Sequence, residues 1–156
     1  MYRKILDPAR MAKIEVFLVH PGGPFWAKKD AGVWSIPKGL IENENDDLLE
    51  TAKREFHEET GITIPPDTKF SDLGFITYTN GKQVYAWGFE NNLSDPVGIK
   101  SNFFSMEWPP KSGKTREFPE ADRGQFFSLE EAKIKIIPAQ TDLLIRLKER
   151  LSNNQS

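Results

Sequence analysis

The spacing of hydrophobic positions predicts more strands than helices along this chain. The segment KIEVFLVH, residues 13–20, is rich in β-branched and large apolar residues and stops at PGGP, so it predicts a strand closed by a loop. Shorter apolar runs predict further strands at GVWSI before Pro37, at FFSMEW and at GQFFSL. The mixed order of elements is typical of an α+β or three-layer α/β domain with a mixed, mostly antiparallel sheet.

A β-hairpin is predicted in the segment FITYTNGKQVYAWGF. Two aromatic and β-branched runs flank Asn80 and Gly81, the dipeptide that a two-residue type I′ turn favours. We therefore expect two antiparallel strands joined by a tight turn at these two residues.

Capping residues predict a central helix that runs roughly from Leu48 to Thr60. Asp47 can cap its N-terminus, with Glu50 three residues later, and Gly61 followed by two prolines ends it. The position of this helix matters because the candidate chemistry of the chain lies on it.

Two more helices are predicted towards the C-terminus. Ser128 can cap a short helix with Glu131 reaching back, and an amphipathic helix begins near Pro138. We expect the central and the C-terminal helix to pack on the sheet. Residues 1–151 are expected to form one domain, and residues 152–156 a polar tail.

Composition narrows the class of protein. With 156 residues, 38% hydrophobic content and a formal net charge of −2, the chain can bury one core, but it lacks the excess of Lys and Arg that a dedicated nucleic-acid binder carries. The absence of cysteine excludes a disulfide scaffold, a zinc-thiolate site and thiol catalysis, and it fits a reducing compartment. No apolar run approaches membrane-spanning length. We expect a cytoplasmic protein with no membrane partner.

Three glutamates crowd into the segment AKREFHEETGI of the central helix. At about 100° per residue, Glu59 and Glu58 fall near about +40° and about −60° from Glu55, so all three carboxylates adjoin the apolar face. A solvated helix face is the simpler interpretation. However, like charges three and four residues apart repel by roughly a few tenths of a kcal/mol per pair unless a cation intervenes. A hard divalent cation such as Mg²⁺, held together with substrate phosphates, is the natural partner.

The same helix carries a family motif. The segment GLIENENDDLLETAKREFHEETGI resembles the Nudix box, G-x5-E-x7-R-E-U-x-E-E-x-G-U, in which U is a large apolar residue. From Gly39 to Arg54 the chain is one residue longer than this pattern, and Glu44 or Asp46 is the counterpart of the isolated upstream glutamate. The second half matches at every fixed position, which are Arg54, Glu55, Phe56, Glu58, Glu59, Gly61 and Ile62.

This resemblance implies a Nudix-like α/β/α sandwich and an enzyme that uses Mg²⁺ or Mn²⁺ and water to cleave a nucleoside diphosphate linked to another group. It implies that Glu55, Glu58 and Glu59 hold metal together with the Gly39 carbonyl. It also implies that Arg54 orients the glutamates through a salt bridge. These assignments make physical sense, because a metal neutralises charge that develops on phosphate oxygens and makes a bound water more acidic.

The residue that takes the proton from the attacking water varies within the family. We leave it open between Glu58 or Glu59 on the helix and a glutamate on a later loop. Glu120 and Glu117, in the segment REFPEAD, are the loop candidates. Exposed loop acids without a function are an equally good interpretation of these two residues.

Resemblance beyond the motif bears on the substrate. The segments FLVHPGGPFWAKKDAGVWSIPKG and SMEWPPKSGKTREFPEADRGQFFSLEEA are similar to a small bacterial Nudix subgroup described as predicted nucleoside triphosphate pyrophosphohydrolases. Tyr78 stands 16 residues after Ile62, close to where Nudix hydrolases of diadenosine polyphosphates carry a base-stacking tyrosine. A hairpin tyrosine is ordinarily a cross-strand packing residue. The leading substrate is a dinucleoside polyphosphate, and the alternative is a (d)NTP or another capped diphosphate.

Basic residues near the motif are candidates for binding a polyphosphate, although a lone surface lysine is usually only solvated. Lys38 is the first choice because it is adjacent to Gly39. The segment 109–125 lacks periodicity, which suggests either a functional lid or disorder, or a segment that orders only when substrate binds. The other basic candidates are Lys114 and Arg116, followed by Lys28, Lys29 and Lys111.

Other interpretations stay open. The chain is alternatively a non-catalytic nucleotide-binding module on the same fold, or its acidic helix is purely structural. The presence of all three carboxylates favours catalysis, because a pure binder has no need to tolerate their repulsion. Related domains open with a glycine-containing strand, whereas this chain begins directly at MYRKIL, so a shortened first strand and an exposed sheet edge are expected.

Overall fold

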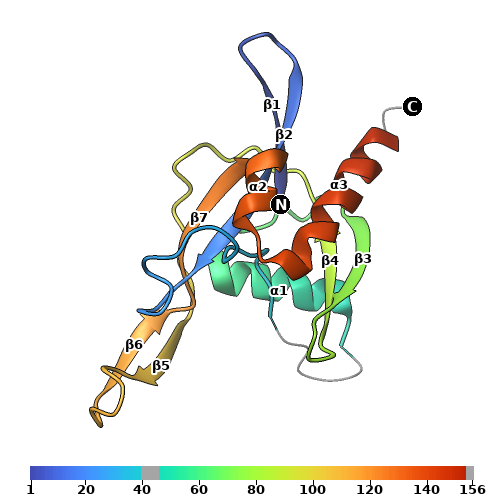
Figure 1. Ribbon diagram of the computed structural model, residues 1–156. Helices are drawn as coiled ribbons and strands as arrows, with labels where there is room; N and C mark the ends of the chain where they lie inside the picture. The colour runs from blue at the N-terminus through green and yellow to red at the C-terminus, as the bar shows by residue number, and fades with distance from the viewer. Residues whose placement is uncertain (40–45, 154–156) are drawn as a thin grey trace.

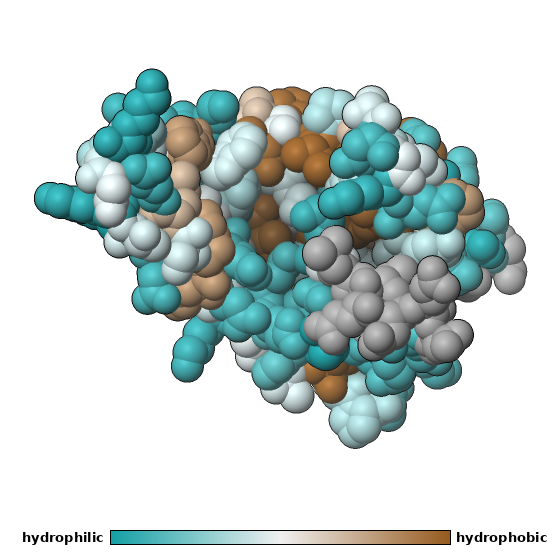
Figure 2. Space-filling view, turned by 90° about the horizontal axis from the view of Figure 1, so that it is seen from below, coloured by the Kyte–Doolittle hydropathy of each residue, from teal (hydrophilic) through white to brown (hydrophobic). Residues whose placement is uncertain are grey.

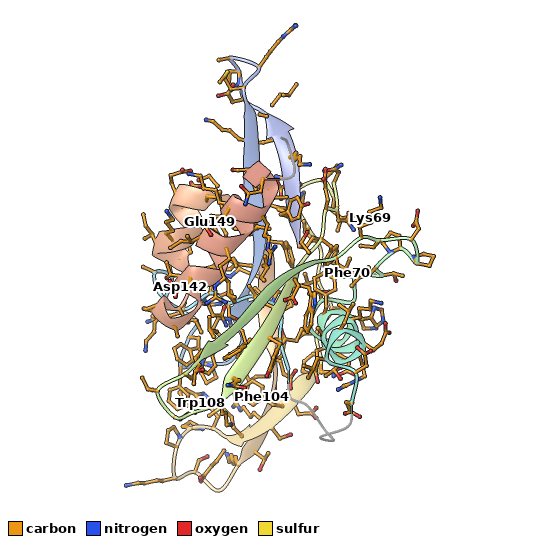
Figure 3. The ribbon with its side chains drawn as sticks, turned by 90° about the vertical axis from the view of Figure 1, so that its right-hand side faces the viewer. Lys69, Phe70, Phe104, Trp108, Asp142 and Glu149 are labelled. Atoms are coloured by element: carbon orange, nitrogen blue, oxygen red, sulfur yellow. The ribbon has the colours of Figure 1, made fainter. Side chains whose placement is uncertain are left out.

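Helices lie on both sides of the strands in the computed structural model, which describes residues 1–39 and 46–153 (Figure 1). In the side view, α2 (Leu129–Lys135) and α3 (Thr141–Asn153) cover one side of the strands, and α1 (Leu48–Thr60) lies on the other (Figure 3). This order of layers confirms the predicted α+β sandwich. Within the described residues, no helix combines the length and apolar character needed to cross a membrane.

The strands pair into three antiparallel sheets. One sheet has the strand order β1-β2-β7, and the other two are the hairpins β3-β4 and β5-β6. Isolated parallel bridges join Tyr2 to Glu90 and Trp34 to Ile136. The pairing is therefore mostly antiparallel, as predicted, but it is divided among separate sheets. The strand bounds are β1 Tyr2–Leu6, β2 Ala12–Pro21, β3 Ser71–Thr77, β4 Gln83–Gly88, β5 Phe103–Glu107, β6 Thr115–Pro119 and β7 Ala121–Ser128.

β2 organises the core because both of its faces are buried. Successive side chains of a strand point to opposite faces. Val16 and Leu18 therefore pack in the cluster that α2 and α3 complete, whereas Phe17 and Val19 pack in the cluster that contains Phe56 of α1. The unbroken apolar run in the sequence is thus the signature of a strand that is covered on both sides.

The predicted boundaries of α1 are confirmed. Oδ1 of Asp47 accepts hydrogen bonds from the backbone N–H groups of Leu49 and Glu50, at 2.9 and 3.1 Å. Gly61 ends the helix with φ of 70°, a left-handed conformation that glycine adopts without strain, and its N–H donates to the His57 carbonyl. The caps therefore fix where the helix begins and ends, and with them which residues share its acidic face.

The β3-β4 hairpin forms as predicted, but its turn differs from the expected type I′. The Tyr78 carbonyl accepts from the Gly81 N–H at 2.8 Å, and the Tyr78 N–H donates to the Lys82 carbonyl at 2.8 Å. The loop therefore has one residue more than expected. Asn80 keeps negative φ and its side chain accepts from the Lys82 N–H, while Gly81 takes the left-handed position with φ of 83°. A type I turn followed by a left-handed glycine uses the same Asn-Gly dipeptide.

Three other expectations change. The segment GVWSI forms only isolated bridges at Trp34 and Ser35 instead of a strand. The segment 109–125, expected to be a lid or disordered, contains β6 and the start of β7, so it belongs to a hairpin. The first strand is present, since β1 pairs along its length with β2, and the Tyr2 N–H also donates to the Phe89 carbonyl at 2.9 Å.

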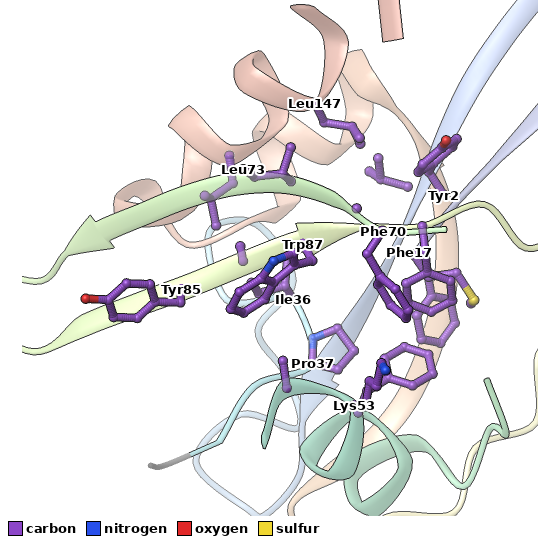
Figure 4. A pocket seen from close by; sticks show the side chains of 18 of the residues that line it. Tyr2, Phe17, Ile36, Pro37, Lys53, Phe70, Leu73, Tyr85, Trp87 and Leu147 are labelled. Carbon is purple, nitrogen blue, oxygen red and sulfur yellow. The ribbon is translucent and has the colours of Figure 1, made fainter. Parts of the chain in front are cut away.

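An apolar cavity of about 80 Å³ lies between α1 and β4 (Figure 4). On β4, Tyr85 and Trp87 lie on the strand face opposite Ala86. Both line this cavity together with Phe56 of α1. Pro37 lines it as well. The turn that leads to Gly39 therefore borders the space between the helix and the hairpin.

Gln140 connects this turn to the hairpin. It is fully buried at the end of a 3-10 helix, Pro138–Gln140, where the sequence predicted the last helix to begin. Its Oε1 accepts from the Ile36 N–H at 2.9 Å, and its Nε2 donates to the Tyr78 hydroxyl at 2.8 Å. A buried amide with both ends satisfied fixes the groups that it joins.

We expect Gln140→Ala to lower the free energy of unfolding by about 3 kcal/mol, because it leaves the Ile36 N–H unpaired in the core and opens a cavity. Tyr78→Phe removes one hydrogen bond and is expected to lower it by about 1 kcal/mol. Urea denaturation followed by circular dichroism measures both changes. A smaller loss for Gln140→Ala than for Tyr78→Phe would contradict the linking function of Gln140.

Candidate functional site

Arg54 holds two of the three glutamates of α1. Its guanidinium lies 3.0 Å from both carboxylate oxygens of Glu58, one turn later, and 3.0 Å from Oε1 of Glu55. The Glu55 side chain is 15% exposed and that of Glu58 is 35% exposed, so the pair lies at the edge of the buried face. Arg54 thus forms salt bridges with both glutamates, and its function in orienting them for catalysis stays a prediction.

The backbone of Lys38 and Gly39 lies against the other side of this acidic face. The Lys38 backbone N–H donates to Oε2 of Glu59 at 3.0 Å. Gly39 approaches the Glu55 carboxylate so closely that a Cβ added at Gly39 would lie 1.7 Å from Glu55 Oε2. Only a residue without a side chain fits there while Glu55 keeps its position.

Burial raises the pKa of two of the carboxylates, Glu55 and Glu59. Loss of solvent raises the pKa of Glu59 to about 7, with smaller raising contributions from the charges of Glu120 and Glu55. The Lys38 N–H and the Lys38 charge act in the opposite direction. Burial also raises the pKa of Glu55, again with the charges of Glu58 and Glu120 adding to the effect and Arg54 opposing it. A cation placed here would favour the ionised forms.

Glu120 joins the acidic face from a different part of the chain. It lies between β6 and β7, and its charge acts on both Glu55 and Glu59. Its backbone is held on two sides, because its N–H donates to the Asn102 carbonyl at 2.8 Å and its carbonyl accepts from the Gly22 N–H at 3.0 Å. Glu117 lies within β6 opposite Ser105. Of the two loop candidates, Glu120 is the one whose charge reaches the helix carboxylates.

A small pocket of about 50 Å³ adjoins these groups. It lies between Lys38 and Gly39 on one side, Glu55 of α1 on another, and Gln83 and Tyr85 of β4. Tyr85 lines both this pocket and the larger apolar cavity, and it projects from β4 (Figure 4). Tyr85 was not predicted from the sequence, although the alternation along the hairpin places it on the face of β4 opposite Ala86, a core residue.

Tyr78 is placed differently. Its ring packs against the core cluster on the side of α2 and α3, and its hydroxyl accepts the hydrogen bond from Gln140. These contacts give it a structural function. Stacking of Tyr78 on a substrate base stays a prediction.

The basic candidates lie on separate segments. Lys38 borders the small pocket, as expected from its place beside Gly39. Lys114 and Arg116 are exposed on the β5-β6 hairpin, which precedes Glu120 in the chain. Asp46 lies just before the helix cap, whereas Glu44, the other counterpart of the upstream glutamate, lies outside the described residues.

The donor set suits a hard divalent cation. It consists of carboxylate oxygens, one of which lies against the Gly39 backbone, and oxygen atoms are the preferred ligands of Mg²⁺ and Mn²⁺. In residues 1–39 and 46–153, no three acidic or histidine side chains already converge as a metal cluster. Arg54 holds Glu55 and Glu58, and the Lys38 N–H holds Glu59. The close approach of Gly39 to the Glu55 carboxylate, and the burial that raises two pKa values, are what indicate a cation site.

Comparison with known proteins gives one family. A family model described as NUDIX domain matches residues 9–147. An uncharacterized 17.7 kDa protein in the e-segB intergenic region of Enterobacteria phage T4 is 39% identical over 51 residues, which are 33% of this chain and 34% of that protein. The match thus spans about a third of the length of this curated relative.

Solved structures show the same fold. A C. elegans Ap4A hydrolase in a binary complex has a TM-score of 0.65 and 22% identity, with 97% of this chain and 94% of that chain covered. A mutT/nudix family protein from Listeria innocua has a TM-score of 0.61 and 14% identity, covering 98% and 90%. The NUDIX domain of Shewanella oneidensis NrtR, crystallised with ADP ribose, has a TM-score of 0.54 and 16% identity, covering 96% and 84%.

We expect Gly39→Ala to weaken Mg²⁺ binding by about 10-fold or more, because the new methyl group displaces the Glu55 carboxylate. Isothermal titration calorimetry with MgCl₂ measures the effect, and far-UV circular dichroism checks the fold. Gly98→Ala is the matched control, since no atom lies within 4 Å of a Cβ at that position. Equal Mg²⁺ affinity in wild type and Gly39→Ala would contradict the site.

Without metal, the raised pKa of Glu59 predicts a pH-dependent stability. The unfolded chain releases this proton near the ordinary glutamate pKa of 4.5, whereas the folded protein keeps it until about 7, so stability falls as pH rises through that window. Glu59→Gln removes this dependence and is expected to be more stable than wild type at pH 8 by up to about 3 kcal/mol.

Urea titrations at pH 5 and pH 8 in chelator measure the difference. Glu50→Gln is the control, because Glu50 is exposed and points away from the acidic face. If wild type and Glu59→Gln lose stability equally between the two pH values, Glu59 is not the group responsible.

Proposed function

The chain belongs to the Nudix family of hydrolases, and we propose that it is a Mg²⁺- or Mn²⁺-dependent pyrophosphohydrolase that cleaves a phosphoanhydride in a nucleoside diphosphate linked to another group. The observation that carries the proposal is the acidic face of α1. There, Glu55 and Glu59 are half-buried against Lys38 and Gly39, and Arg54 holds Glu58. Desolvated carboxylates that adjoin a pocket are expected at a metal-dependent phosphoryl site and are costly elsewhere.

Glu55, Glu58, Glu59 and the Gly39 carbonyl would hold the cation. When bound, such a cation neutralises charge on phosphate oxygens and lowers the pKa of a bound water. Arg54 positions two of these ligands through the contacts described above. The Lys38 N–H fixes the orientation of the Glu59 carboxylate, and the Lys38 side chain contributes positive charge beside the small pocket.

The two leading candidates for accepting the proton of the attacking water are Glu59 and Glu120. Glu59 lies on the helix under the Lys38 N–H, and Glu120 reaches the same acidic face from the β6-β7 junction. Glu120 is the more exposed of the two and is not held by a backbone N–H in the described contacts, so it is freer to exchange a proton with solvent. Glu58 remains the third candidate.

A dinucleoside polyphosphate is the proposed substrate, with a (d)NTP or another capped diphosphate as the alternative. Similarity in fold to a protein described as an Ap4A hydrolase supports the first. Similarity to the NUDIX domain crystallised with ADP ribose supports including ADP-ribose among the candidates. The non-catalytic alternative predicts that a nucleotide binds without being cleaved.

The test is product analysis by chromatography. Diadenosine tetraphosphate, the common nucleoside triphosphates and ADP-ribose are each incubated with Mg²⁺ and with chelator. Release of ATP and AMP from diadenosine tetraphosphate in Mg²⁺ alone is the expected result. Metal-dependent products from the other compounds would change the substrate. Absence of any metal-dependent product would favour the binding module.

We expect Glu59→Gln to lower kcat by about 100-fold or more while the fold is retained, because the variant loses the negative charge of a metal ligand or general base. Steady-state kinetics on the best substrate measures the change. Glu117→Gln is the control, because the charge of Glu117, unlike that of Glu120, is not among those that act on Glu55 or Glu59. Unchanged turnover in Glu59→Gln would refute the assignment of the acidic face.

A further inference from the structure

Aromatic side chains gather where the loop of residues 22–30 meets the β5-β6 hairpin. The rings of Phe25 and Trp108 lie edge to face, with centroids 5.4 Å apart and an interplanar angle of 87°. Phe25 is nevertheless 55% exposed. Trp108 lies at the end of β5 on the hairpin together with Phe104 (Figure 3). Large exposed rings that share a surface with charged groups are typical of binding sites.

One face of the hairpin combines rings with positive charge. Cross-strand partners lie on the same face of a hairpin. Phe104 is opposite Phe118, Met106 is opposite Arg116, and the Trp108 N–H donates to the Lys114 carbonyl. These residues therefore alternate with the residues of the other face, where Phe103 and Glu117 lie. Two of the basic candidates from the sequence, Lys114 and Arg116, thus share a face with the aromatic side chains.

The loop that carries Phe25 is anchored at both ends. The Gly22 N–H donates to the Glu120 carbonyl at 3.0 Å. At the other end, the fully buried His20 lies 2.7 Å from the Lys29 carbonyl through Nε2 and 2.8 Å from Asp122 through Nδ1. Anchoring of this kind reduces the conformational entropy that binding would otherwise remove.

Phe104 of the aromatic face lies against the loop segment that bonds to Glu120. Gly23 follows the residue bonded to Glu120, and a Cβ built on Gly23 would lie 3.1 Å from the Phe104 ring. The charge of Glu120 acts on Glu55 and Glu59. Seen from below, the molecule is hollowed beside the hairpin, and hydrophobic side chains of the hairpin lie next to the hollow (Figure 2).

We propose that Phe25 and Trp108 form a stacking surface for a nucleoside base, and that Lys114 and Arg116 on the same hairpin face bind the phosphates that lead from it towards α1. This inference rests on the proposed function and specifies where that site selects its substrate. A base has a flat π-face of matching chemistry, and a nucleotide is the small molecule that places several negative charges next to such a face. A purely apolar ligand would leave Lys114 and Arg116 without a counterpart.

Binding of ADP and of inorganic pyrophosphate, each with Mg²⁺, separates the base from the phosphates. In isothermal titration calorimetry, Phe25→Leu and Trp108→Leu are expected to raise the Kd for ADP by about 10-fold and to leave the Kd for pyrophosphate unchanged, because leucine keeps apolar volume without an aromatic face. Trp108→Phe restores such a face and is expected to bind ADP nearly as wild type does. Collapse of the hairpin would instead weaken pyrophosphate binding as well.

Phe103→Leu is the matched control, because Phe103 is 63% exposed on the opposite face of the same hairpin. Unchanged ADP affinity in both leucine variants, an equal loss in Phe103→Leu, or no ADP binding by wild type would overturn the proposal. Product analysis on the same proteins separates the two hypotheses. Ring-dependent ADP binding without cleavage of any nucleotide would refute the proposed function alone, whereas normal turnover with an unchanged KM in both leucine variants would refute the stacking surface alone.

Discussion

The approach of the Gly39 backbone to the Glu55 carboxylate is the constraint on which the acidic site depends. A side chain at residue 39 would displace the Glu55 carboxylate, which already lies beside other acids. The same turn presents the Lys38 N–H to Glu59, so one short segment fixes two of the three helix carboxylates. Arg54 fixes the third from within α1. A cation would find its ligands preorganised by backbone and by a salt bridge, which reduces the entropic cost of assembling them.

The fold holds this turn in place from the opposite side. The buried amide of Gln140 binds the backbone three residues before Gly39, and the rings and aliphatic side chains of β2 fill both layers around it. α1 is held against the rest of the fold by its buried Phe56, and its Glu58 and Thr60 carbonyls accept hydrogen bonds from the N–H groups of Asn102 and Lys100. The electrostatic strain of neighbouring carboxylates is therefore maintained by packing that lies outside the site.

Local chemistry determined what the sequence could predict. α1 was predictable to its ends because Asp47 and Gly61 act within one turn of the residues that they cap. The acidic face followed from helical period alone. The extra residue in the β3-β4 turn was not predictable, because Asn-Gly serves both turn types and the choice depends on the register of the two strands. The proximity of Glu120 to Glu55 and Glu59, and the presence of Tyr85 beside Glu55, depend on segments that meet only in three dimensions.

The separation of α1 from the β5-β6 hairpin has an evolutionary consequence. The residues that would perform chemistry are built on a capped helix beneath a glycine turn, whereas the exposed hairpin residues contribute little to the core. Substitutions on the hairpin are therefore expected to change the free energy of unfolding little, because they change the surface without opening a cavity. A duplicated copy of this chain could diverge towards a new nucleotide through a few hairpin and loop residues while its helix stays unchanged, which makes the hairpin the segment in which paralogues are expected to differ most.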